Sequence, residues 1–247
     1  MKIKKENIKL RNDEDIEIIK IDNLTPSEKK DYAGSLIEIS KLAGQDPKDH
    51  VYDWLDVTDL LIFAKSKNNN SAVGFSSIGF LDNNVLHIAA TMIIPEYQKK
   101  GIVTILTKTA IKYFFINKRG ILEFWKPVYV LFRTQNPLVY FDFYRRNLPI
   151  YPNPKKEFKP DEKIIEIAKK NSKKLWPYAE FDDETFVLKG AYKLHPFLII
   201  NPENISWSKN ESVNNFFRDR LNIDEKSEDA LVTVIKVKLL DLLLTNS

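Results

Sequence analysis

The stretch TMIIPEYQKKGIV, residues 91–103, contains residue types that can hold a phosphate group. A strand is predicted over residues 85–94 and a helix over residues 102–117. The loop between them consists of Gln98, Lys99, Lys100 and Gly101. A helix start leaves backbone N–H groups without partners inside the helix and carries the positive end of the helix dipole. A tight loop feeding this end can bind an anion, and Gly101 lets the backbone come close.

The order of the surrounding elements can also be predicted. Thr25 and Pro26 supply an N-cap and a proline at the first helical position, so a helix is predicted to run to about Leu42. Three strand-like runs separated by turn-rich tripeptides predict an antiparallel meander over residues 60–67, 71–81 and 85–94. Further strands are predicted over residues 16–24, 127–133, 184–192, 195–200 and 230–239. Further helices are predicted over residues 138–146, 163–176 and 212–222, with a helix or a turn over residues 49–59.

Composition predicts a folded protein without disulfides. Apolar residues make up 43% of the chain and aromatic residues 12%, which is ample for a packed core. The absence of cysteine excludes disulfides and thiolate metal sites. The net charge of +4 comes from mixed signs along the chain, which argues against a nucleic-acid partner. The longest apolar run, residues 231–244, is interrupted by charges, and no signal pattern is seen, so we expect a cytoplasmic protein with no membrane partner.

The loop resembles the acyl-CoA pyrophosphate loop of the GNAT family of N-acetyltransferases, which reads Gln/Arg-x-x-Gly-x-Gly/Ala. Gln98, Gly101 and Val103 stand at the three diagnostic positions, and Val103 departs from the usual small residue. The predicted element order is similar to that of the family over residues 60–146 and more loosely over residues 16–59. The resemblance implies an α/β fold, with an α+β mixed sheet that is mostly antiparallel and flanked by helices.

The same resemblance implies a single domain over residues 1–247. Its core would comprise residues 16–146 and 206–240, with the strand at 230–239 joining the central sheet. Residues 147–205 would then be an insertion after the fourth helix. This insertion could cover the substrate end of the cleft.

The resemblance also implies which residues bind acyl-CoA, the expected co-substrate. Backbone amides of the loop and helix start would hold the pyrophosphate, from Gln98, Lys99, Lys100, Gly101, Ile102 and Val103. In the family, a bulge in the fourth strand exposes amides that hold the pantetheine arm and polarise the thioester, and this region corresponds to Met92, Ile93 and Ile94. Asn136 corresponds to an asparagine that contacts CoA, and it would equally serve as a helix N-cap. The alternative is a plain strand-loop-helix crossover with a polar surface loop.

Transfer to an amine requires a base, because a lysine-type amine has a pKa of about 10.4 and must lose a proton. It also requires an acid that gives a proton to the departing thiolate. Family members carry a carboxylate base near the position of His87, eleven residues before Gln98, and a histidine could act in its place. A buried histidine bonded to a neighbour is the alternative, and it is the commoner case for a lone strand histidine. The acid of the family is a tyrosine seven residues after the asparagine. That position is Phe143, with Tyr144 next to it and Tyr140 one turn earlier, and ordinary aromatic packing is the alternative for all three.

These features predict an N-acyltransferase that moves an acetyl or other short acyl group from acyl-CoA to a primary amine within a ternary complex. Two alternatives stay open. A catalytically inactive GNAT-fold protein that binds CoA or a protein partner would explain Val103 and the offset of Tyr144. A nucleic-acid or protein binding module would make the loop coincidental. The three histidines are too dispersed to predict a metal site, and the sequence determines neither the acceptor amine, the acyl chain length nor whether the protein is a homodimer.

Overall fold

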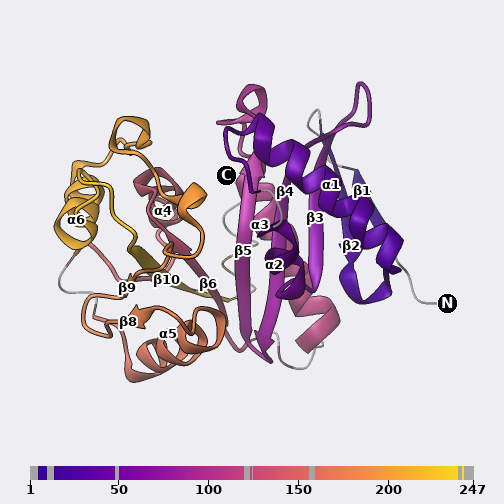
Figure 1. Ribbon diagram of the computed structural model, residues 1–247. Helices are drawn as coiled ribbons and strands as arrows, with labels where there is room; N and C mark the ends of the chain where they lie inside the picture. Colours follow the sequence, from indigo (N-terminus) through magenta and orange to yellow (C-terminus); the bar gives the residue numbers. More distant parts are fainter. Residues whose placement is uncertain are drawn as a thin grey trace. The chain divides into compact units, whose positions relative to one another are not determined.

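The structure is a computed structural model that describes residues 5–9, 14–47, 50–119, 123, 125–155, 159–238 and 241. Its contacts divide the chain into two compact units, unit 1 over residues 1–123 and unit 2 over residues 124–247. Each unit holds part of a mostly antiparallel sheet with helices against it (Figure 1). The α/β fold class, with a mixed and mostly antiparallel sheet, is therefore confirmed.

The sheet of unit 1 is an antiparallel array in chain order (Figure 1). Its strands are β1 (Lys5–Lys9), β2 (Glu14–Lys20), β3 (Leu60–Ser66), β4 (Ala72–Asp82) and β5 (Val85–Ile93). The predicted meander is thus confirmed as β3, β4 and β5. Strand β1 was not predicted, because its segment alternates charged and single apolar residues and its pairing with β2 is a tertiary contact.

Three helices belong to unit 1: α1 (Pro26–Leu42), α2 (Val51–Asp56) and α3 (Ile102–Phe114). Helix α1 begins where predicted, since the Thr25 hydroxyl accepts from the Glu28 N–H and the Glu28 carboxylate accepts from the Thr25 N–H over 2.8 Å. This reciprocal capping box satisfies two backbone donors that the helix leaves open. Helix α3 ends earlier than predicted, and the chain continues as a π-helix over Phe115–Arg119.

The helices cover the two faces of the unit 1 sheet. Phe75 of β4 lies 6.4 Å from Trp54 of α2, measured between ring centres. Phe80 of the same strand lies 5.1 Å from Phe114 of α3. Side chains alternate between faces along a strand, so residues 75 and 80 point to opposite faces. Helices α1 and α2 therefore lie on one face of this sheet and α3 on the other, as Figure 1 also shows.

The sheet of unit 2 has the strand order β6, β10, β9, β8, and the short β7 also pairs with β10. Its strands are β6 (Val128–Thr134), β7 (Ile150–Tyr151), β8 (Glu180–Phe181), β9 (Val187–Lys189) and β10 (Ala230–Val237). Its helices are α4 (Pro137–Tyr144), α5 (Glu162–Leu175) and α6 (Glu211–Leu221). Strand β10 pairs with β6, as predicted for the run at 230–239, although residues 239–240 lie outside the described part.

Of the strands predicted in unit 2, one is absent and one is shorter than predicted. Residues 195–200 form no strand; a 3-10 helix occupies Pro196–Leu198. Pro196 has no N–H to donate to a ladder, and its fixed φ suits the first residue of a helical turn. The strand predicted over 184–192 shrinks to β9, because Phe186 has a φ of 61° and breaks the extended backbone.

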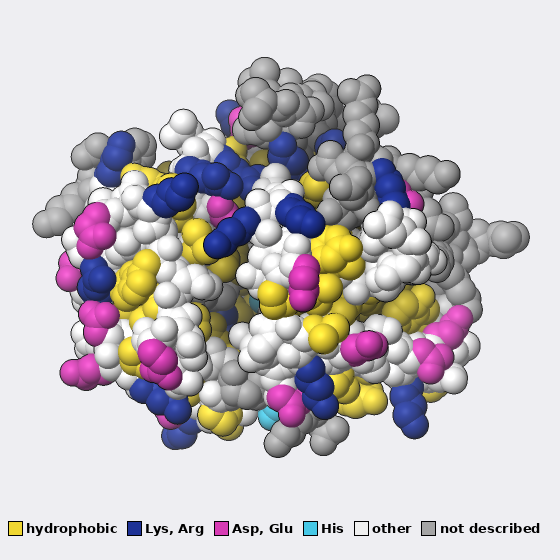
Figure 2. All heavy atoms as spheres, turned by 90° about the horizontal axis from the view of Figure 1, so that it is seen from above, with side chains coloured by type: hydrophobic (Ala, Val, Ile, Leu, Met, Phe, Trp, Pro, Cys, Tyr) yellow, Lys and Arg dark blue, Asp and Glu magenta, His cyan; other side chains and the backbone are white. Residues whose placement is uncertain are grey.

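The segment predicted as an insertion, residues 147–205, contributes β7 and β9 to pairing with β10. Its role as an insertion within one domain stays a prediction. Basic and acidic side chains both lie on the face seen in Figure 2, in line with the mixed charge of the sequence. Within the described residues, no helix is long and apolar enough to cross a membrane.

Candidate functional site: the loop between β5 and α3

The chain turns from β5 into α3 through a short 3-10 helix, Pro95–Tyr97, and four exposed residues. Gly101 is the N-cap of α3, with a φ of 80° and a ψ of 8°. This left-handed conformation is readily adopted only by glycine. Ile102, the first helical residue, is 2% exposed and anchors the helix start in the core. The first turn of α3 carries no acidic residue, so no side chain competes with an anion for its N–H groups.

The two lysines of this loop add positive charge to the helix start. Lys99 has a φ of 63°, which is unusual for a residue with a side chain. Its side chain and that of Lys100 are both exposed, and the Lys100 ammonium lies 4.4 Å from the centre of the Tyr97 ring. Left-handed residues close to one another turn successive N–H groups toward one side, which is a concavity that binds anions. Backbone and side chains of the loop therefore both favour a phosphate.

Gln98 connects the loop to the end of the strand. Its side-chain Nε2 donates to the Ile93 carbonyl over 3.0 Å. Val103 is partly buried, and its carbonyl accepts from the Thr107 hydroxyl over 2.8 Å within α3. The Gln98 side chain thus has a structural role in shaping the loop, in addition to any role of its backbone.

The pairing of β5 with β4 shows which strand amides point toward β4. The Ile94 N–H donates to the Val73 carbonyl over 3.0 Å, toward β4. Backbone groups alternate in direction along a strand, so the Met92 N–H also points toward β4. The N–H of Ile93 points to the far edge of β5, the edge facing away from β4. Of the three predicted strand amides, only that of Ile93 lies on this far edge.

The bulge in β5 lies earlier than the resemblance implied. Ser77 opposes Ala90 and Ile78 opposes Ile88, so Ala89 is the extra residue. Beyond the bulge the alternation is regular, which places the Thr91 N–H on the far edge together with that of Ile93. Sequence reasoning missed Thr91, because the direction of an amide depends on the register between β4 and β5.

His87 lies in β5 opposite Gly79, on the face that α1 and α2 cover. Its side chain is 3% exposed. A Cβ atom added to Gly79 would lie 2.3 Å from the Val57 carbonyl oxygen and 3.8 Å from His87 Nδ1. Only a glycine at position 79 therefore lets the chain after α2 approach the strand beside His87. A role as base would require a route for the amine or a water to this buried ring.

Asn136 and the aromatic candidates belong to unit 2. The Asn136 side-chain oxygen accepts from the Leu138 N–H over 2.9 Å and from the Val139 N–H over 3.4 Å. It is therefore the N-cap of α4, as predicted. Its amide nitrogen is not required for this cap and could contact a ligand.

The three aromatic positions of α4 have different environments. Tyr140 is fully buried, and its hydroxyl donates to the Pro152 carbonyl over 2.5 Å. Burial raises the pKa of Tyr140 well above its ordinary value, so it is a poor proton donor to a thiolate. Phe143 packs on Phe132 at 5.1 Å between ring centres. Tyr144 stacks on Tyr140 with 6.2 Å between the ring centres and is partly exposed. Of the two tyrosines, Tyr144 is therefore the one whose side chain reaches solvent.

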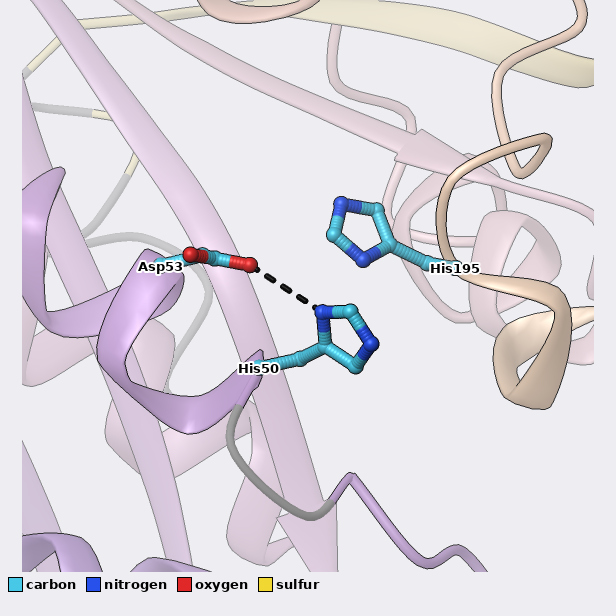
Figure 3. A group of neighbouring side chains, drawn as sticks. All are labelled: His50, Asp53 and His195. Carbon is cyan, nitrogen blue, oxygen red and sulfur yellow. Dashed lines mark hydrogen bonds and ion pairs between the residues drawn. The ribbon is translucent and has the colours of Figure 1, made fainter.

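A separate contact between a histidine and a carboxylate lies at the start of α2. His50 Nδ1 lies 3.1 Å from Asp53 Oδ2, and Figure 3 shows the ring directed at this carboxylate. Both side chains are partly exposed, so this is a local pair at a helix start. His195, which Figure 3 also labels, belongs to unit 2.

A comparison with protein-family models identifies part of this chain. Residues 29–127 match the acetyltransferase (GNAT) family. The matched segment contains most of α1, the meander, the loop after β5 and the whole of α3. It includes the loop and His87 and excludes Asn136 and Tyr144, and it assigns no role to any of these residues. A comparison with curated protein sequences gives no match.

Solved GNAT structures show limited likeness to this chain. A GNAT family acetyltransferase from Elizabethkingia anophelis with acetyl-CoA bound has 14% identity and a TM-score of 0.44, covering 93% of this chain and 100% of its own. The PaiA N-acetyltransferase from Thermoplasma acidophilum in complex with coenzyme A has 19% identity and a TM-score of 0.35, covering 53% and 87%. The ribosomal-protein-S18-alanine N-acetyltransferase from Escherichia coli has 15% identity and a TM-score of 0.37, covering 53% and 74%. At these TM-scores none of the likenesses bears on function.

Proposed function

We propose that this chain is an N-acyltransferase that moves an acetyl or other short acyl group from acyl-CoA to a primary amine. The observation that carries the proposal is the Gly101 turn. It has left-handed backbone at residues 99 and 101, two exposed lysines and a helix start without acidic residues. This turn lies within the segment that matches the GNAT family. Together these features supply fixed donors and positive charge for the pyrophosphate of CoA.

The far edge of β5 would hold the rest of the co-substrate. Acyl-CoA whose pyrophosphate lies on the loop would run back along β5, and the N–H groups of Thr91 and Ile93 would meet its pantetheine arm and thioester carbonyl. Amides aimed at the carbonyl oxygen would stabilise the negative charge that develops when the amine attacks, an effect of roughly 3 kcal/mol per donor. We propose Thr91 in place of Met92 and Ile94, whose amides face β4.

The transfer itself would be direct. The amine nitrogen forms a bond to the carbonyl carbon, the C–S bond breaks, and the thiolate of CoA takes a proton. His87 would accept the proton of the amine through water, and Tyr144 would donate the proton to the thiolate. Asn136 would contact CoA through the part of its side chain that the helix cap leaves available.

Binding and turnover should be tested separately. Calorimetric titration with acetyl-CoA and with free CoA should give micromolar dissociation constants. Release of CoA thiol with a panel of primary amines should then reveal turnover, and intersecting initial-rate lines would support a ternary complex. His87→Asn should lower kcat by about a hundredfold or more with unchanged affinity for acetyl-CoA. Absence of binding at millimolar acetyl-CoA would refute the proposal.

The second candidate is a GNAT-fold protein that binds CoA and catalyses no transfer. Three observations favour it: Val103 stands where a small residue is usual, Phe143 stands where a tyrosine is expected, and His87 is 3% exposed. It predicts the same affinity for CoA and no thiol release with any amine. If CoA and acetyl-CoA raise the Tm equally and no amine is acylated, this second candidate function is supported.

A further inference from the structure

Arg133 of β6 lies against two aromatic rings in unit 2. Its guanidinium carbon lies 4.9 Å from the centre of the Trp176 ring and 4.7 Å from the centre of the Tyr192 ring. Both rings are 6% exposed, so they are fixed by the surrounding core. Trp176 caps the C-terminus of α5 and Tyr192 follows β9, so three separate segments form this clamp. A guanidinium that lies over ring faces keeps its edges for hydrogen bonding.

One edge of the guanidinium is already used by the protein. Arg133 Nη1 donates to the Ala191 carbonyl over 2.6 Å and to the Tyr178 hydroxyl over 3.2 Å. The Tyr178 hydroxyl in turn donates to the same carbonyl over 3.2 Å. Burial raises the pKa of Tyr192 against the opposing charge of Arg133, so this phenol stays neutral. None of these partners carries a negative charge.

The other edge of Arg133 has no hydrogen-bond partner among the residues that the structure describes. In the described part of the chain, no carboxylate lies within ion-pair distance of Arg133, and its Nε and Nη2 donate to no residue. Two other arginines of unit 2, Arg145 and Arg218, differ in this respect. Arg145 pairs with Asp142 over 2.9 Å, and Arg218 pairs with Glu211 over 2.9 Å.

An arginine held in this way is suited to a carboxylate. Nε and Nη2 form the side of the guanidinium that binds two carboxylate oxygens in parallel. The rings and the Ala191 carbonyl already fix the orientation, so little side-chain entropy would be lost on binding. Tyr178 is 36% exposed, and its ring offers apolar surface next to the charge. A ligand with a carboxylate and an apolar body would match both features.

We propose that Arg133 and Tyr178 form a binding subsite for the carboxylate of a small organic acid. The subsite lies wholly in unit 2 and does not depend on acyl-CoA binding. Arg133 is partly buried, and no described residue supplies a counter-charge to it. Burying such a charge is costly unless a partner is supplied. A bound carboxylate supplies this partner.

The test uses benzoate, neutral benzamide and inorganic phosphate as probes of the full-length protein in low-chloride buffer. Ligand-observed NMR titration should show benzoate binding, and benzamide should not compete. Arg133→Lys keeps the charge but removes the two-donor edge, so it should weaken benzoate binding about tenfold or more. Arg145→Lys is the matched control, an exposed arginine with its own carboxylate, and it should bind benzoate like the wild type.

A second measurement does not depend on the variant folding. In the wild-type protein, benzoate should shift the NMR signal of the Arg133 Nε–H group and the amide signals of Ala191 and Tyr192. Absence of these shifts at high millimolar benzoate would overturn the proposal. Equal benzoate affinity in Arg133→Lys and wild type would also overturn it. Binding of phosphate with no binding of benzoate would overturn the assignment to a carboxylate.

Discussion

Replacing Gly101 with glutamine and with glutamate separates the two effects, backbone conformation and charge, by which the loop is proposed to bind a phosphate. The two side chains have nearly the same shape and differ by one charge. No heavy atom lies within 4 Å of a Cβ added at Gly101, so neither side chain meets a steric clash at its base. The φ of 80° remains unfavourable for both. The pair therefore has a common backbone cost and differs in electrostatics alone.

The magnitudes follow from the geometry. A residue with a side chain in the left-handed conformation costs roughly 1–2 kcal/mol, so Gly101→Gln should weaken CoA binding by at most about thirtyfold. This cost lowers the affinity only to the extent that the loop without CoA can relax to another backbone conformation. A carboxylate about 4 Å from a phosphate charge adds roughly 1 kcal/mol in water and about 4 kcal/mol near a protein surface. Because Gly101 is exposed, the lower half of this interval applies. Gly101→Glu should therefore bind CoA about tenfold more weakly than Gly101→Gln.

The assay is calorimetric titration with CoA at low and high ionic strength. Raising the salt to about 1 M shortens the Debye length to about 3 Å, so the difference between the two variants should shrink while their common backbone cost remains. Dephospho-CoA, which keeps the pyrophosphate, should show the same ratio between the variants. Equal affinities of the glutamine and glutamate variants at low salt would show that no phosphate lies at this helix start, and the reasoning would be refuted.

Three further predictions concern other parts of the chain. Tyr140→Phe should lower Tm, because it loses a buried hydrogen bond worth about 1–3 kcal/mol, and should leave kcat unchanged. Tyr144→Phe should leave Tm unchanged and lower kcat about a hundredfold, and the reverse pattern would contradict the assignment of Tyr144 as the acid. Lys65→Met should reduce the free energy of unfolding, measured in urea, by about 3 kcal/mol, because it leaves the Glu17 carboxylate, which is 3% exposed, without its ammonium partner 2.6 Å away. Glu17→Gln should reduce it by less, because the Lys65 side chain that is left is 20% exposed. Equal losses would show that burial does not set the cost. The pKa of Asp182 is lowered, chiefly by the Thr185 N–H, so its stabilisation is present above the unfolded-state pKa and is lost as pH falls through the folded-state pKa. The Tm deficit of Asp182→Ala at pH 7 should therefore shrink as the pH falls through the folded-state pKa of Asp182, and a deficit that does not change with acidification would contradict this cause.

Some of the fold could be predicted because it depends on short-range chemistry. The start of α1 follows from Thr25, Pro26 and Glu28, which satisfy helix donors within one turn. The Gly101 turn follows from a glycine between an apolar strand and an apolar helix. The hairpins that join β3, β4 and β5 follow from their asparagine-rich turns. In each case the residues that interact lie a few positions apart, so the pattern carries the information.

Parts of the candidate site could not be predicted, because they depend on register and on contacts between distant segments. The register between β4 and β5 places the bulge at Ala89 and turns the Thr91 amide to the far edge. The burial of His87 depends on the approach of the Val57 carbonyl to Gly79, twenty-two residues along the chain. A one-residue shift of either strand would reverse these orientations.

Arg133 shows the same division between sequence and tertiary structure. As a sequence position it is a charged residue near the end of an apolar strand, with no local signal of a binding role. Trp176, Tyr178 and Tyr192 meet it only after α5 and β9 have packed on the sheet of unit 2. The sequence by itself determined the element order, the helix caps and the Gly101 turn, because these are local. Only the tertiary structure decided which amides, rings and charges are accessible, because accessibility depends on what distant segments cover.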